Sequence, residues 1–196
     1  MQERIIQIIH QSIESKMQAG ELLTPFIVDA SELLVSALLN ERKILVAGNG
    51  NCAALGDIFV GNLLNRFQHE RPALPAINLM GDSAVVSAIA SDSSYNDVFA
   101  KQVRAIGQPG DVLLLVSNNG NASNLIQAVA AAHDREMAVI ALTAEEGGDI
   151  ATLLDVNDIE LRAPAEAIFQ ILEIHLLCLL CLCDLIDYQL FGTSHE

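Results

Sequence analysis

Apolar residues along the chain follow two different spacings. Over residues 2–40 they recur every three or four positions, which is the spacing of amphipathic helices. We expect two helices here, over residues 2–19 and 23–40, with Gly20 as the break between them. The N-terminal part of the chain is therefore predicted to be helical.

From residue 43 onward the pattern changes to short continuous apolar runs, which are typical of buried parallel strands. The expected strands are residues 43–47, 75–79, 111–117, 138–143 and a weaker 158–163. Segments with helical spacing separate them, at about 52–66, 83–90, 95–106, 121–134 and 147–154. This alternation predicts an α/β fold, a doubly wound parallel five-stranded sheet flanked by helices.

A long apolar helix is expected to close the chain, over about residues 165–190. From Ile171 to Ile186 only Glu173, His175 and Asp184 are strongly polar, so almost every face of this helix must be buried. We expect a homo-oligomer in which this helix and the N-terminal helices form the interface. The alternative is that the helix lies deep within one subunit.

The length of 196 residues suits one domain with a sizeable core. We expect a single domain over residues 1–196. It would comprise an N-terminal helical segment (1–40), an α/β core (41–163) and the C-terminal helix (164–191).

The charge balance argues against direct nucleic-acid binding. The chain has 25 acidic against 10 basic residues, a formal net charge of −15, and no cluster of Lys and Arg to contact phosphates. An acidic surface instead favours a protein partner with basic patches.

Cysteine usage and the terminal sequences indicate a cytoplasmic protein. Three of the four cysteines lie in "CLLCLC" (178–183), which lacks the second cluster or spaced His of a zinc motif, so we expect free thiols. The N-terminus has no secretory pattern. The longest apolar run, residues 176–183, is too short to span a bilayer, so no membrane association is expected.

Two polar loops follow predicted strands. In a doubly wound sheet, ligands bind beyond the carboxyl ends of the strands, where helix N-termini favour anions. The residues expected to form an anion pocket are Gly48, Asn49, Gly50 and Asn51 in the first loop, and Ser117, Asn119, Asn121 and Ser123 in the second. Either loop alone could be a simple turn with a helix cap. Together they predict a polar pocket for a phosphate.

The order of these motifs is more specific than any one of them. "KILVAGNG", "NRFQHERPALPAINL", "GDVLLLVSNNGNASN", "VIALTAEEGG" and "DIELRAP" precede the long terminal helix. This order resembles the SIS-type sugar isomerase fold and, along nearly the full chain, the phosphoheptose isomerase family. The resemblance implies isomerisation of a ketose phosphate by a Glu and a His, and a metal set of His, Glu, Gln and His.

The chain departs from this family at the residues that carry the chemistry. By the motif alignment, the metal and catalytic positions hold Ile58, Asn62, Leu172 and Leu180. Isomerisation through an enediol needs a group that removes and returns a proton, and these side chains do not supply one. We therefore expect a protein with no catalytic residues, no metal and no cofactor. Asn119 and Ala122 stand where the family's phosphate loop has Ser, so only weak phosphosugar binding is expected.

Within the family, the chain resembles most a branch that associates with the replication initiator DnaA. That resemblance implies that Leu190 and Phe191 contact DnaA, although packing of a helix end would also explain the pair. The expected function is a non-catalytic homotetrameric adaptor that gathers DnaA at the chromosomal origin and promotes initiation complexes. The alternatives are a phosphosugar-binding regulator, or a sedoheptulose 7-phosphate isomerase that uses Asp57 or Asp92 as its base.

Overall fold

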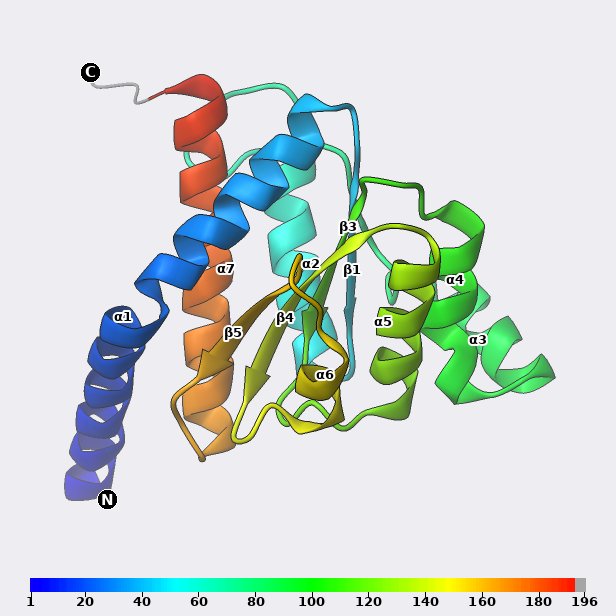
Figure 1. Cartoon of the computed structure of the whole chain (residues 1–196). Helices are drawn as coiled ribbons and strands as arrows, with labels where there is room; N and C mark the ends of the chain where they lie inside the picture. The colour runs from blue at the N-terminus through cyan, green and yellow to red at the C-terminus, as the bar shows by residue number, and fades with distance from the viewer. Residues whose placement is uncertain (193–196) are drawn as a thin grey trace.

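The computed structural model describes residues 1–192 and has a five-stranded, all-parallel sheet with helices on both faces (Figure 1). The strand order is β2-β1-β3-β4-β5. The strands are β1 (Ile44–Gly48), β2 (Ala76–Asn78), β3 (Val112–Val116), β4 (Ala138–Ala144) and β5 (Ile159–Ala163). The predicted fold class and all five predicted strands are confirmed, with boundaries that differ by a few residues.

The helices form one layer on each face of the sheet (Figure 1). One face carries α1 (Gln2–Leu39), α2 (Asn51–Leu64) and α7 (Ile168–Phe191). The other carries α3 (Ser83–Asp92), a 3₁₀ turn (Tyr95–Asp97), α4 (Val98–Ile106), α5 (Ser123–Asp134) and α6 (Gly148–Leu153). Neighbouring strand residues point to opposite faces, so Val112 packs under the first layer and Leu113 under the second. Both layers are apolar, which is why the strands appear in the sequence as unbroken apolar runs.

The prediction of two N-terminal helices is wrong, because α1 runs without interruption from Gln2 to Leu39. Gly20 lies inside it and does not end it. Pro25 also lies inside this helix, where it has no N–H to donate to the carbonyl four residues earlier. The axis of α1 changes direction partway along, as expected near such a residue, and its N-terminal half extends beyond the rest of the molecule (Figure 1).

The closing helix α7 packs against α1, α2 and β5. Its buried residues are Ile171, Ile174, His175, Cys178, Leu179, Leu182, Cys183 and Ile186. Large apolar side chains on its other face are exposed, among them Phe169, Leu177 and Tyr188. By length and composition α1 and α7 could each cross a membrane, but much of the apolar surface of α7 packs on the sheet core. Burial within one subunit therefore explains one face of α7 and leaves the other uncovered.

The strand order fixes where a ligand can approach the sheet. β1 lies between β2 and β3, so the chain leaves β1 toward one edge of the sheet and later returns to its other side. At such a reversal the connections diverge and leave a crevice beyond the carboxyl ends of the two strands. The loops after β1 and β3 border this crevice, which is where the polar pocket was predicted.

Candidate functional site

The first loop of the candidate site is a tight turn between β1 and α2. Gly48 ends the strand, and a Cβ there would lie 2.8 Å from the backbone carbon of Cys52. Gly50 has a φ of +54°, a conformation that other residues adopt at a cost. Glycine at these two positions allows α2 to begin immediately, at Asn51, so its N-terminus faces the crevice.

The second loop connects β3 to α5 and is held by its own side chains. The Ser117 hydroxyl accepts a hydrogen bond from the Gly120 N–H at 3.0 Å, and the side-chain Oδ1 of Asn119 accepts one from the Asn121 N–H at 3.1 Å. Gly120 has a φ of +70°, and a Cβ there would lie only 1.9 Å from the backbone oxygen of Gly147. The loop therefore has one defined shape that depends on glycine.

Side chains join the two loops across the crevice. The amides of Asn49 and Asn124 exchange two hydrogen bonds, of 2.9 and 2.8 Å. The thiol of Cys52 donates to the side-chain oxygen of Asn118 at 3.1 Å, and burial raises the pKa of this thiol to about 11, so it stays protonated. The phenol of Tyr95 also donates to Asn49, at 3.0 Å. These contacts make the two loops one structural unit.

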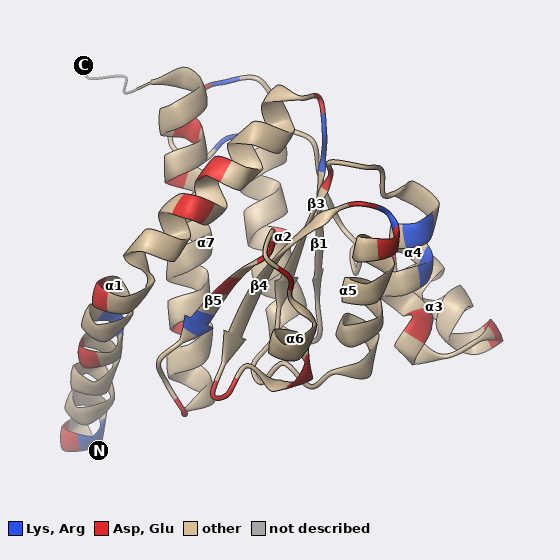
Figure 2. Cartoon of the chain, viewed as in Figure 1, with Lys and Arg blue, Asp and Glu red and all other residues tan. Residues whose placement is uncertain are grey.

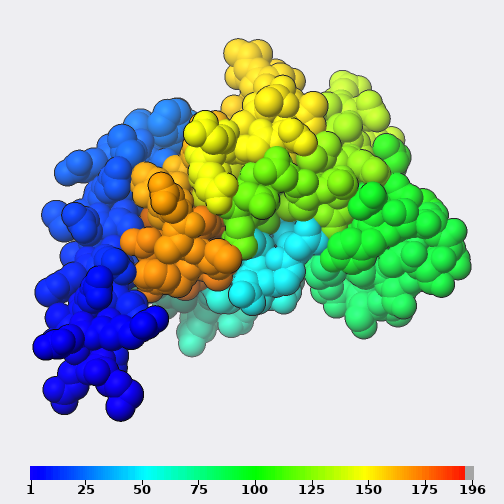
Figure 3. Space-filling view, turned by 90° about the horizontal axis from the view of Figure 1, so that it is seen from below, coloured from blue at the N-terminus to red at the C-terminus, as the bar shows by residue number. Residues whose placement is uncertain are grey.

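A third loop, between β4 and α6, completes this edge of the sheet. The Asn121 side-chain oxygen accepts from the Asp149 N–H at 3.0 Å, and the Gly120 carbonyl accepts from the Ile150 N–H at 3.0 Å. Figure 3 looks onto this edge, where the start of α2 (cyan), the second loop (green) and the third loop (yellow) lie close together. This loop, Asn124 and Tyr95 were not among the site residues predicted from the sequence. The motif "NNGNASN" contains Asn124, and "TAEEGG" contains the third loop. Their contacts with the site, however, depend on which strands are neighbours in the sheet.

The arrangement is suited to binding an anion. In the described part of the chain, neither Gly50 nor Ala122 caps its helix with a side-chain hydrogen bond. The N–H groups of Cys52, Ala53 and Leu125 already donate to loop carbonyls, so those of Asn51, Ser123 and Asn124 are the ones that a ligand can reach. The predicted residues divide into two sets here. Gly48, Gly50, Ser117 and Asn49 shape the loops, whereas Asn51, Asn119, Asn121 and Ser123 are exposed at the edge.

A groove of about 840 Å³ lies beside these loops at the ends of β4 and β5. Three carboxylates line it, from Glu145, Glu146 and Glu166. Figure 2 shows acidic residues at this end of the sheet and along α1. Because like charges repel, a phosphate fits the uncapped helix ends better than this groove.

The four positions to which the resemblance assigns an acid, a base and metal ligands lie on α2 and α7. Ile58 is exposed and Leu172 packs against the core. Leu180 lines an apolar groove of about 410 Å³ between α1 and α7. The backbone carbonyl of Asn62 accepts a hydrogen bond from Arg71 at 2.6 Å. None of these four side chains is titratable.

Three other titratable residues, His175, Asp57 and Asp92, are candidates for proton transfer. His175 is fully buried, its Nε2 is 2.9 Å from the Thr143 carbonyl oxygen, and burial lowers its pKa to about 4. It is therefore neutral at pH 7. Asp57 is exposed on α2 and accepts from the Asn78 amide at 2.6 Å, whereas Asp92 is exposed at the end of α3.

The pair predicted to contact a partner is split by the fold. Both residues belong to the last turn of α7. Leu190 packs against the core, whereas Phe191, the last residue of the helix, is 45% exposed. A contact of this pair with another protein stays a prediction.

The comparisons with known proteins agree with this fold. The SIS domain model matches residues 9–144. A phosphoheptose isomerase from Chromohalobacter salexigens is 50% identical over 193 residues, 98% of each chain, and one from Shewanella halifaxensis is 47% identical over the full length of both. A solved phosphoheptose isomerase structure from Francisella tularensis superposes with a TM-score of 0.92 at 42% identity, covering 94% of this chain and 97% of that one. One from Neisseria gonorrhoeae gives 0.90 at 40%, covering 95% and 98%. The chain belongs to the SIS-domain phosphoheptose isomerase family.

These relatives correct the functional expectation. The prediction of a non-catalytic adaptor for DnaA in replication initiation is wrong, because relatives that match over nearly the whole chain at 40–50% identity are named phosphoheptose isomerase. The expectation that the chain is not an enzyme is contradicted on the same ground. It rested on four positions, Ile58, Asn62, Leu172 and Leu180, whereas the likeness to the isomerases extends over the whole fold.

Proposed function

We propose that this protein binds a sugar phosphate at the carboxyl ends of β1 and β3. The observation that carries the proposal is that two hydrogen bonds between the side-chain amides of Asn49 and Asn124 hold the two loops together. This contact lies where the strand order reverses. The uncapped N-termini of α2 and α5 would receive the phosphate, and the exposed Asn and Ser side chains at the edge would hydrogen-bond the sugar hydroxyls.

Isomerisation of a heptose phosphate is the candidate reaction, and the names of the relatives support it. It requires a proton carrier at a position other than Asn62 or Leu180. Asp57 is the carboxylate of α2, the helix whose N-terminus forms the site, and Asn78 holds its side chain. We propose Asp57 as the first residue to test for proton transfer.

We also propose that the protein self-associates, as a tetramer, through α1. The N-terminal half of α1 exposes Ile5, Ile6, Ile8, Ile9, Ile13 and Met17, and it projects away from the body (Figure 3). An apolar surface of this kind on a projecting helix marks a contact with another molecule.

A cytoplasmic location is part of the proposal, supported by the four free cysteines. We also propose that the chain is related, within the family, to the branch that associates with DnaA. This relationship is proposed without the adaptor role.

The experiment has two readings from one preparation. Thermal unfolding is followed with sedoheptulose 7-phosphate, unphosphorylated sedoheptulose and inorganic phosphate, and turnover of sedoheptulose 7-phosphate is followed by chromatography. The binding site is supported if sedoheptulose 7-phosphate raises the Tm more than sedoheptulose or inorganic phosphate does. Turnover that falls in Asp57→Asn but not in Asp92→Asn supports isomerisation. A Tm that no sugar phosphate changes would contradict the proposal.

A further inference from the structure

Another cavity lies at the amino ends of the strands, on the opposite side of the sheet from the loops of the candidate site. It encloses about 610 Å³ where α1 and α5 end and where β3, β4 and β5 begin. Its ionisable lining residues are mostly acidic: Asp111, Glu136, Asp155 and Asp158, with His133 and Arg42. Asp111 is already paired with Lys43 at 2.5 Å. His133, Asp155 and Asp158 form one wall of the cavity.

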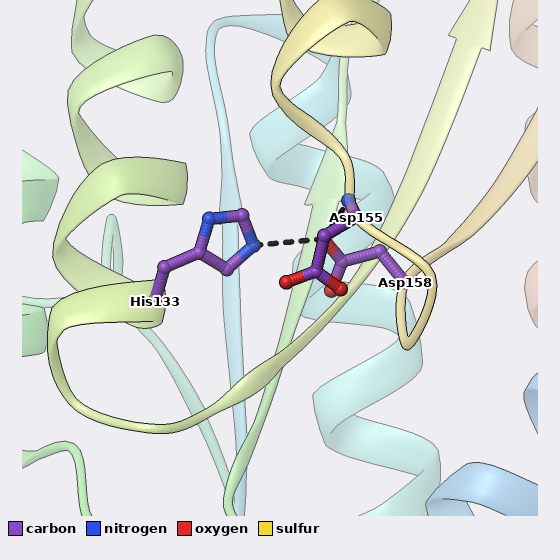
Figure 4. A group of neighbouring side chains, drawn as sticks. All are labelled: His133, Asp155 and Asp158. Atoms are coloured by element: carbon purple, nitrogen blue, oxygen red, sulfur yellow. Dashed lines mark hydrogen bonds and ion pairs between the residues drawn. The ribbon is translucent and has the colours of Figure 1, made fainter.

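On that wall three metal-ligating side chains converge. His133 lies in the last turn of α5, and Asp155 and Asp158 lie in the connection between α6 and β5. One ligand atom from each lies within 4.8 Å of the others, and all three point toward the same space (Figure 4). His133 Nε2 is 2.7 Å from Asp158 Oδ2.

Asp158 is the fixed member of this group. Its carboxylate is 1% exposed, and it accepts from the Val139 N–H at 2.7 Å and from the Asp155 N–H at 2.9 Å. A buried carboxylate held by backbone donors is fixed in direction, as a metal ligand must be. Asp155 is exposed and can turn toward an ion without breaking a buried contact.

We propose that His133, Asp155 and Asp158 bind a divalent transition-metal ion, with Zn²⁺ or Mn²⁺ as the chemical class. One imidazole and two carboxylates are ligands that such ions accept, and the two carboxylates balance the charge of the ion. The carbonyl ends of α1 and α5 also face this edge, and the C-terminal end of a helix favours a cation. Water would complete the coordination from the cavity.

Binding requires one local adjustment. Around a tetrahedral Zn²⁺, with ligand bonds of about 2.0–2.2 Å, ligand atoms stand about 3.4 Å apart. The 2.7 Å gap between His133 and Asp158 must therefore open, and His133 Nε2 must release any proton it carries to solvent. His133 is 28% exposed at a helix end and has room to move. The ion would replace the hydrogen bond that now joins α5 to the start of β5.

The test is calorimetric titration of the full-length, tag-free protein with Zn²⁺ and, separately, Mn²⁺. We compare the wild type with His133→Gln, Asp155→Asn and the control Asp134→Asn, which removes the neighbouring exposed charge on α5. We expect one site per chain in the wild type and the control. We expect affinity to fall at least about tenfold in His133→Gln and in Asp155→Asn. Equal affinity in all four proteins, or no binding, would overturn the proposal.

Two further readings keep the result interpretable. His133→Gln retains an amide that can donate to Asp158, so its Tm without metal should stay close to that of the wild type. A saturating ion should raise the wild-type Tm by about 5 °C or more and leave the His133→Gln value unchanged. The absorption spectrum of the Co²⁺ form should lack thiolate charge-transfer bands. Their presence would place the ion on cysteine and overturn the assignment.

Discussion

Asn49 and Asn124 exchange two amide hydrogen bonds, of 2.9 and 2.8 Å, across the crevice between β1 and β3. Asn49 lies in the loop after β1 and Asn124 in the first turn of α5, 75 residues apart in the chain, and Asn124 is only 2% exposed. Each amide satisfies the other, so the two loops keep one relative position. The candidate site therefore depends on a contact that neither loop makes alone.

Removal of this contact should loosen the site. In Asn124→Ala, the Asn49 side-chain N–H loses its acceptor in a partly buried place, while Asn49 Oδ1 keeps the Tyr95 hydroxyl, and we expect the free energy of unfolding to fall by about 1–3 kcal/mol. Chemical denaturation measures this change. A double-mutant cycle with Asn49→Ala should give a coupling energy of about 0.5–3 kcal/mol. Asn157→Ala, an exposed change at the other edge of the sheet, is the control. Independent effects of the two substitutions would show that the pair does not join the loops.

His175 should make stability depend on pH in the acid range. Burial lowers its pKa to about 4 in the folded protein, below the value of about 6.5 expected when it is unfolded, so the unfolded chain binds more protons between these values. The contribution is complete above about pH 6.5 and is lost as the pH falls toward about 4, by up to about 3 kcal/mol. Urea unfolding at about pH 7 and about pH 4.5 measures it.

The pH dependence is assigned by substitution. The loss of stability between about pH 7 and about pH 4.5 should be smaller in His175→Gln than in the wild type, because the variant has no imidazole to protonate. His69→Gln, which changes an exposed imidazole, should keep the wild-type dependence. Identical pH profiles for all three proteins would mean that His175 is accessible to protons in the folded state.

Self-association through α1 predicts a change in mass on substitution. Ile13 is 52% exposed on the projecting half of α1, so an Asp there would place a charge in the interface without disturbing the core. Light scattering should show a smaller particle for Ile13→Asp and an unchanged particle for Ile106→Asp, at the exposed end of α4. A wild-type mass equal to one chain, or no effect of Ile13→Asp, would count against this interface.

The strands could be predicted from the sequence because both faces of the sheet are covered, which leaves a run such as Val112–Val116 wholly apolar. The helix break at Gly20 was wrong because a glycine weakens a helix but does not end it when the flanking turns pack on the body. The helix also continues through Pro25, which removes one helical hydrogen bond without ending the helix.

The site was predictable only as two separate loops. Glycine and asparagine after a strand indicate a turn near a ligand, and the structure places both loops at the crevice. The pairing of Asn49 with Asn124, and the packing of Gly120 on Gly147, depend on β3 lying between β1 and β4, which the sequence pattern does not specify. The functional prediction failed for a different reason, since it weighed four substituted positions above the likeness of the whole chain.

Calorimetric titration of sedoheptulose 7-phosphate into the wild type, Gly120→Ala and Gly110→Ala shows directly whether the joined loops bind a sugar phosphate. Both glycines have positive φ, so both substitutions strain the backbone, but a Cβ at Gly120 would also lie 1.9 Å from the Gly147 oxygen and displace the second loop. Gly110 lies at the opposite edge, beside Arg42. We predict binding in the wild type and in Gly110→Ala, and an affinity at least about tenfold lower in Gly120→Ala. No binding in the wild type, or equal affinity in all three, would contradict it.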